Sequence, residues 1–263
     1  MKLRNILALA LFATAFTACE TVDEDERFIG PVEFTPKKNV LIEDFTGQLC
    51  VNCPKAAQTT HMLQKAYGNE HIIPVAIHPS TKAMPNLGSP QLSSPVSDAY
   101  VTLWNVPNLP NGLVDRTEGL SLYKTWSAQA VKRMQKEALA DITINSCNID
   151  DDKNITINVD VLGKIDVEAS LQLWLTEDSI KGLQKTESGM DREYIHNHVL
   201  RDTINALYGE PITLQANQIL SKNYTYTVKN EKWNTKNLDI IAFVFNDKEG
   251  VMQVVKKKIT TLK

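Results

Sequence analysis

The hydrophobic pattern changes its period near residue 140, and this change predicts two architectures in one chain. Before that point, two continuous apolar runs at 40–42 and 72–77 flank a segment in which small and apolar residues recur at helical spacing. Buried strands joined by a helix in this way form parallel βαβ units. The pattern therefore predicts an α/β domain over residues 36–140, with further helices at 91–103 and 121–140.

Beyond residue 140, apolar and polar residues alternate. Alternation with a period of two is typical of half-buried strands. About seven short strands, separated by Asp-, Asn- and Gly-bearing turns such as 150–154 and 246–250, are of the number expected for an immunoglobulin-like β-sandwich. We therefore expect this sandwich over residues 141–263, and the predicted fold class is α/β plus all-β.

The beginning of the chain has the pattern of a secretory signal. A basic start with Lys2 and Arg4 precedes an apolar run over 6–16 and a small-residue ending at Cys19. The run is shorter than the about 20 residues that a membrane-crossing helix needs. A cysteine after Phe-Thr-Ala resembles a bacterial lipoprotein cleavage site, which implies removal of residues 1–18 and acylation of Cys19. An ordinary signal peptide with a chance cysteine is the alternative.

Acidic side chains dominate the segment that follows Cys19. Five of the seven residues at 20–26 are acidic, and like charges keep such a block extended. Residues 19–35 are therefore interpreted as a tether between a lipid anchor in the membrane and the folded part. An acidic stretch in this position also resembles the signal that sends lipoproteins of Bacteroides-type bacteria to the outer face of the outer membrane. A plain solvated linker is the alternative.

Composition and charge narrow the choice of function. The 263 residues include 28 Lys and Arg against 31 Asp and Glu, which gives a net charge of -3, and 43% are apolar. This balance is typical of a globular protein and provides no basic stripe for phosphates. We therefore expect no nucleic-acid partner. No cofactor and no bound metal are predicted.

Two cysteines, Cys50 and Cys53, lie where the first predicted strand gives way to a helix. Pro54 suits a first helical turn, where a missing N–H costs nothing. Unpaired N–H groups and the helix dipole favour a thiolate there, so we expect Cys50 to be the exposed attacking sulfur and Cys53 the resolving one. A zinc site uses the same spacing, but no second pair of Cys or His ligands follows.

This region resembles thioredoxins. Asp44-Phe45 lies six residues before Cys50, where thioredoxins have an acid-Phe pair. The resemblance implies that Asp44 is buried and relays a proton to Cys53. The usual tryptophan before the first cysteine is replaced by Leu49, and the usual Gly-Pro between the cysteines by Val-Asn, so the redox potential does not follow from the resemblance.

The segment 106–114 resembles the loop and strand that carry a cis-proline opposite the cysteines of thioredoxins. The resemblance implies a cis bond before Pro110, with Pro107 as the rival position. A cis-proline there would offer Leu109 as a backbone edge for an extended peptide. We therefore expect a protein or peptide partner to bind at the cysteines and the Pro110 loop.

The stretches 46–54, with the cysteine pair, and 196–201, His-Asn-His-Val-Leu-Arg, together with Cys19 resemble the 28-kDa outer-membrane-protein family of Bacteroides-type bacteria. The resemblance implies an outer-membrane lipoprotein with a thioredoxin-like domain. Surface exposure and adhesion or receptor roles are suggested for the family beside that domain.

Three weaker candidates remain. His196 and His198 would point the same way on a strand, and a packed or hydrogen-bonded pair is favoured over a metal site. Cys147 is expected to be a buried, inert thiol. His78 ends a strand near the expected position of the cysteines, where it would tune Cys50 or simply belong to a loop.

Two functions are compatible with these patterns. The first is thiol-disulfide exchange, with Cys50, Cys53, Asp44 and Pro110 as the catalytic residues. The second is non-enzymatic adhesion or ligand binding at the cell surface, in which the cysteine pair is a permanent structural disulfide. Fold does not decide between them.

Overall fold

In the computed structural model of the protein, residues 34–82 and 89–261 are described. The predicted signal 1–18, the lipidation site Cys19 and nearly all of the tether lie outside these residues. These described residues belong to one compact unit. Within the described residues, no helix is both long and apolar enough to cross a membrane.

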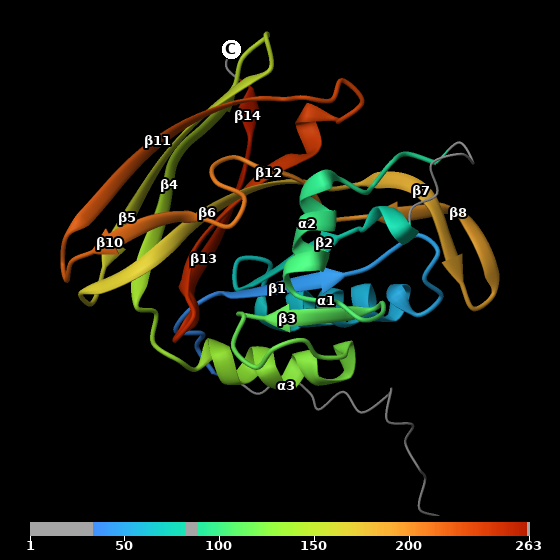
Figure 1. Ribbon diagram of the computed structural model, residues 1–263, viewed down its shortest axis with the longest axis horizontal. Helices are drawn as coiled ribbons and strands as arrows, with labels where there is room; N and C mark the ends of the chain where they lie inside the picture. Colours follow the sequence, from blue (N-terminus) through green and yellow to red (C-terminus); the bar gives the residue numbers. More distant parts are fainter. Residues whose placement is uncertain (1–33, 83–88, 262–263) are drawn as a thin grey trace, which may run out of the picture. The chain divides into compact units, whose positions relative to one another are not determined.

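The first half contains the predicted βαβ unit. Strand β1 (Val40–Phe45) is buried at every position and pairs in parallel with β2 (Ile72–Ile77), and α1 (Cys53–Tyr67) connects them. Strand β3 (Asn111–Val114) adds to the other side of β1 in antiparallel orientation. Helix α1 packs with α3 (Tyr123–Met134) against one face of these strands (Figure 1).

The predicted helix at 91–103 is shorter than expected. Helix α2 (Pro95–Leu103) begins after Ser94, whose hydroxyl accepts a hydrogen bond from the N–H of Ser97, and Pro95 occupies the first turn. A serine cap followed by proline is a strong helix start. Tyr100 of α2 packs in the core on the sheet face opposite α1 and α3.

The second half consists of strands, as the alternation predicts. Besides a separate hairpin described below, its strands are β4 (Ala140–Ile149), β5 (Asn154–Gly163), β6 (Val167–Glu177), β9 (Val199–Thr203), β10 (Glu210–Leu214), β11 (Ile219–Thr227), β12 (Leu238–Asn246), β13 (Gly250–Lys258) and β14 (Thr260–Thr261). A four-stranded sheet, β11-β5-β4-β14, packs through its alternate side chains against β6, β10, β12 and β13, which forms a β-sandwich.

One sheet runs through both halves. Its strand order is β13-β12-β6-β9-β2-β1-β3, with β10 paired to β6. The strand β9 pairs in parallel with β2 at Ala76 and Val199 and in antiparallel orientation with β6. The boundary expected between residues 36–140 and 141–263 falls at the start of β4, after α3. It does not divide the strands into two sheets, because the large sheet contains strands from both sides of the boundary. Sequence periodicity reports how each strand is buried and carries no information on which distant strand lies beside it.

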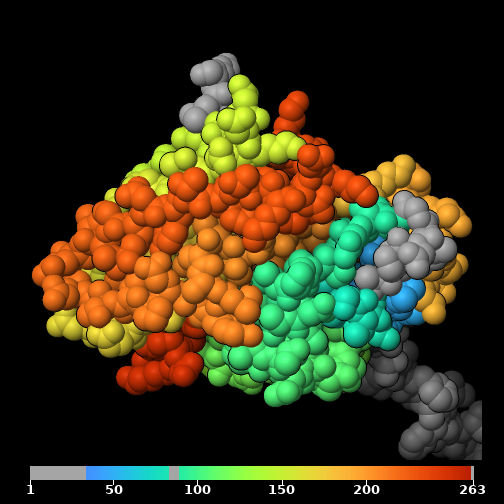
Figure 2. All heavy atoms as spheres, turned by 45° about the horizontal axis from the view of Figure 1, so that its top comes forward, coloured from blue at the N-terminus to red at the C-terminus, as the bar shows by residue number. Residues whose placement is uncertain are grey.

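A hairpin of β7 (Ile180–Thr186) and β8 (Gly189–His196) forms a two-stranded sheet of its own. In Figure 1 it projects from the end of the large sheet at which β1 and β2 end, and the space-filling view of Figure 2 shows it beside the first half of the chain. It follows that the second half contributes directly to the surroundings of the cysteine pair.

Candidate functional site

The two predicted cysteines form a disulfide at the start of α1. Cys50 and Cys53 have Cα atoms 5.4 Å apart and are bonded through their sulfurs. Helix α1 begins at Cys53, with Pro54 in its first turn, as expected. The exposure expected for Cys50 is not observed, because Cys50 is 8% and Cys53 2% exposed. The neighbours Leu49 and Asn52 are exposed, whereas Gln48 is 1% exposed, so the loop before α1 is buried at some positions and open at others.

The hairpin β7–β8 accounts for part of this burial. Gln184 of β7 donates hydrogen bonds from Nε2 to the carbonyl oxygens of Cys50 and Gly47, and the N–H of Lys185 donates to the carbonyl of Gln48. Gln48 in turn donates from Nε2 to the carbonyl of Leu183. Sequence reasoning missed these contacts, since a glutamine on a strand has no pattern that marks it as a partner for a distant loop.

Asp44 lies on β1, buried under the disulfide loop. The residue is 4% exposed, and its buried Oδ1 has no hydrogen-bond partner. Burial disfavours the charged form, which raises the pKa of Asp44 to about 8. Asp44 and Cys53 line the same cavity. The carboxyl therefore carries a proton at neutral pH, in the cavity that Cys53 also lines.

The proline loop lies at the end of β3 that faces the cysteines. The peptide bond between Leu109 and Pro110 is cis, so the expectation of a cis bond at Pro110 is confirmed, and Pro107 is not that position. Because Phe45 of β1 pairs with Asn111, Pro110 lies level with the residue that follows β1. A Cβ placed on Gly47 would be 3.2 Å from Cδ1 of Leu109. The loop therefore touches the chain just before the cysteines.

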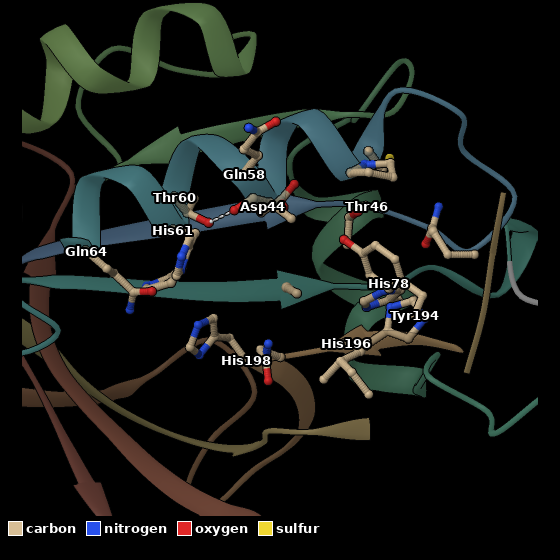
Figure 3. A pocket seen from close by; sticks show the side chains of 18 residues that line it. Asp44, Thr46, Gln58, Thr60, His61, Gln64, His78, Tyr194, His196 and His198 are labelled. Atoms are coloured by element: carbon tan, nitrogen blue, oxygen red, sulfur yellow. Dashed lines mark hydrogen bonds between the residues drawn. The ribbon is translucent and has the colours of Figure 1, made fainter. Parts of the chain in front are cut away.

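A half-open cavity of about 350 Å³ lies beneath the disulfide, between α1, the ends of β1 and β2, and β8 (Figure 3). Four of the five histidines of the chain line it. Its walls also carry hydroxyl, amide and carboxyl groups. The polar lining residues include Asp44, Thr46, Gln58, Thr60, His61, Gln64, His78, Gln184, Tyr194, His196 and His198.

The histidines of this cavity differ from expectation. His196 ends β8, whereas His198 lies in the turn after it with a φ of 59°, so the two do not share a strand. His196 instead packs edge-on against His78, with ring centroids 5.7 Å apart. Desolvation lowers the pKa of His78 to about 3 and that of His196 to about 4, so both rings are neutral at pH 7. His198 pairs through Nδ1 with Asp178 at 3.0 Å.

Other candidate ligands and thiols lie apart from this site. Among residues 34–82 and 89–261, no group of three His, Cys, Asp or Glu side chains is arranged to hold a metal ion. Cys147 is a free thiol on β4 that is buried in the sandwich core, as predicted. Desolvation raises the pKa of Cys147 to about 12, so this thiol stays protonated and is unsuited to exchange.

Comparison with known proteins gives the family. The solved structure of HBP35 of Porphyromonas gingivalis covers 86% of this chain and 77% of its own length, with a TM-score of 0.69 and 16% identity, which shows a shared fold alone. A β-glucosidase from Kluyveromyces marxianus covers 46% of this chain and 14% of its own at 13% identity and a TM-score of 0.27, too low to carry an argument. No curated protein matches the chain.

The family model described as outer membrane protein Omp28 matches residues 97–263. The match includes the proline loop and the whole β-rich half, and it begins after the cysteine pair. Membership therefore bears on the location of the protein and leaves the chemistry of the disulfide to be argued from its geometry. Because the match spans more than half of the chain, this protein belongs to the outer membrane protein Omp28 family, and its location is the outer membrane.

Proposed function

We propose that the first half of this outer-membrane protein is a thioredoxin-like domain that exchanges disulfides with a protein partner. The observation that carries the proposal is the grouping of a CxxC disulfide at a helix N-terminus, a buried protonated Asp44 and a cis-Pro110 at one end of a sheet. The order of β1, α1, β2, antiparallel β3 and α3, with both helices on one face, resembles that of thioredoxin-like folds, which supports the proposal.

The exchange can be written from the oxidised state of the structure. A thiolate of the partner attacks Sγ of Cys50, a mixed disulfide forms, and Cys53 leaves as a thiolate. Asp44, which is protonated at neutral pH, supplies the proton that the leaving sulfur needs. A second thiolate of the partner then attacks the mixed disulfide at the partner's own sulfur. The partner leaves with a disulfide, Cys50 leaves as a thiolate that takes its proton from water, and the protein is left as a dithiol.

The anchor is part of the same proposal. Acylation of Cys19 and a tether over residues 19–35 would hold the domain at the outer membrane while leaving it free to meet partners. Mass spectrometry of the protein purified from membranes tests this point. A chain that begins at Cys19 and carries acyl groups is the expected result, and a chain cleaved elsewhere or without lipid would contradict it.

Trapping of a mixed disulfide is the direct test of exchange. The exchange is reversible, and in the reverse direction the thiolate of Cys50 attacks a disulfide of the partner and Cys53 resolves the mixed disulfide. The Cys53→Ala variant lacks this resolving sulfur, so the partner stays attached to Cys50 and is seen as a shifted band that disappears on reduction. The Cys50→Ala variant is the matched control and is expected to trap nothing. The wild type is expected to reduce insulin disulfides faster than free dithiothreitol. Failure of both the trap and the insulin assay would reject the proposed exchange.

A structural disulfide in a binding lipoprotein is the second candidate, and the burial of both sulfurs favours it. The reduction potential separates the two. Catalytic pairs fall between about -270 and -120 mV, whereas structural disulfides of secreted proteins lie below about -300 mV. Equilibration of the wild type with glutathione or dithiothreitol buffers, followed by alkylation of free thiols, gives this value. A potential below the catalytic range would favour the structural role.

A further inference from the structure

The far end of the hairpin β7–β8 is separated from its base by a break in the strand pairing and is more exposed. The pairing register is interrupted between Gly182 and Gln184. The residues beyond this interruption, 184–193, are called the hairpin tip below. All of them are described, and Gln184 is the one residue of the tip that is buried. The tip is therefore held to the body of the protein through very few side chains.

Gln184 holds the tip against the disulfide loop through its amide. Its Nε2 lies 2.9 Å from the carbonyl oxygen of Cys50 and 3.3 Å from that of Gly47. Beside it, the N–H of Lys185 donates to the carbonyl of Gln48 at 2.7 Å. Gln184 is 3% exposed. Hydrogen bonds in such a site are costly to lose, because water does not replace them while the tip stays closed.

The other contacts near the tip are an exposed ion pair and hydrogen bonds that hold the base of the hairpin. The ion pair between Lys55 and Glu187, 3.0 Å long, has both side chains largely in solvent and contributes little. Leu183, just before the tip, is fixed separately, since its N–H donates to Ser89 and its carbonyl accepts from Gln48. The base of the hairpin thus stays bound when the tip is released, and the register interruption is a suitable pivot.

We propose that Gln184 is a positioning residue that latches the hairpin tip over the Cys50–Cys53 disulfide, and that release of this latch gives a partner sulfur access to Cys50. The role assigned to it rests on the proposed exchange function. Attack on a disulfide requires an approach to the sulfur, and Cys50 is buried although Leu49 and Asn52 beside it are exposed. The latch would therefore exclude small thiols and favour a partner that displaces the tip.

Replacement of Gln184 by methionine tests the latch, because methionine keeps the volume and removes the hydrogen bonds. We expect dithiothreitol to reduce the disulfide of Gln184→Met about tenfold faster than that of the wild type, as measured by acid quenching and mass spectrometry after alkylation. The reduction potential should be unchanged, because we expect the latch to hold the tip equally in the disulfide and dithiol forms. Its loss then changes the rate of attack on the disulfide and leaves the equilibrium between the two forms as it is.

Gln172→Met is the matched control. Gln172 is also fully buried and donates to Asn205 and Ala206, remote from the cysteines in the sheet. This variant should lose stability without faster reduction at 25 °C. Equal rates of reduction in the wild type and Gln184→Met, or an equal acceleration by Gln172→Met, would overturn the latch. A failed trap with Cys53→Ala alongside faster reduction of Gln184→Met would reject exchange and keep the latch.

Discussion

Replacing Arg116 by methionine is expected to lower the free energy of unfolding by about 3–5 kcal/mol, the largest loss of stability foreseen for a single change. The guanidinium of Arg116 is paired with the carboxylate of Glu43, its Nε lying 2.5 Å from Oε1, and both side chains are almost completely buried. Removal of one member of a buried pair leaves the other charged or forces it to take up a proton. Urea unfolding followed by tryptophan fluorescence measures the loss.

The aromatic rings around Arg116 increase the loss of stability expected from its substitution. Its guanidinium carbon lies 4.5 Å from the ring centroid of Phe245 and 5.0 Å from that of Phe243, and the rings of Trp174, Trp104 and Tyr100 follow at 5.6, 5.7 and 5.8 Å. A cation among aromatic faces gains additional stabilisation when it is desolvated. These rings come from α2, β6 and β12 and from the residues next to them, so the same substitution loosens the join between the two halves of the chain.

A rescue and a control complete this experiment. Burial already raises the pKa of Glu43, and the loss of Arg116 raises this pKa further. The folded variant then holds a proton that the unfolded chain releases, so the loss of stability of Arg116→Met relative to the wild type should grow from pH 5 to pH 8. The added change Glu43→Gln removes the stranded carboxyl and should recover part of the loss. Lys181→Met, which breaks an exposed pair with Glu193, should leave the unfolding midpoint in place. A midpoint for Arg116→Met equal to that of the wild type would contradict the buried-pair assignment.

The second large effect is expected from Asp44→Asn, which should stabilise the protein by about 2–4 kcal/mol at pH 7 while slowing exchange about a hundredfold. The carboxyl has a pKa of about 8 in the folded state, against an ordinary value of 3.8. Between these values the unfolded chain releases the proton and the folded chain keeps it, so stability falls as pH rises. Asparagine does not ionise, so the stability of Asp44→Asn does not fall with pH in this way. It has no carboxyl proton to donate to Cys53.

The pH profile is the decisive measurement for Asp44. From pH 4 to pH 8 the wild type should lose stability steadily, and Asp44→Asn should lose much less, as followed by thermal unfolding in buffers matched for ionic strength. Asp44→Ala removes the same charge but leaves a cavity and should gain less than asparagine does. A destabilised Asp44→Asn with an unchanged pH slope would show that the carboxyl is ionised and hydrogen-bonded in the folded protein.

Local sequence signals located the elements that carry the cysteines. Pro54 marked the first turn of α1, the apolar run at 72–77 marked β2, and the alternation after residue 140 marked the sandwich strands. Each of these signals acts over a few neighbouring residues, where burial and backbone preference leave a direct pattern. The cis bond before Pro110 was predicted through the resemblance to thioredoxins, since X-Pro statistics alone favour a trans bond.

Contacts between distant segments had no comparable signal. Gln184 lies 134 residues from Cys50 in the sequence. From the sequence alone, a polar side chain on a strand is expected to face solvent, because its distant partner is not known. Arg116 and Glu43 appeared as ordinary charged residues, although their partnership places both in the interior. The expected exposure of Cys50 was wrong for the same reason, because the hairpin that lies over it belongs to the half of the chain in which no site was predicted.

The buried ammonium of Lys38 has a consequence for how the chain folds. It is satisfied by Asp115 and by the carbonyl of Val251, which lies 213 residues further along. Val251 and Val254 of β13 also fill the core that contains β1 and β2. The environment of β1 is therefore completed by one of the last segments of the chain, so the folding of the first strand depends on contacts of very long sequence separation.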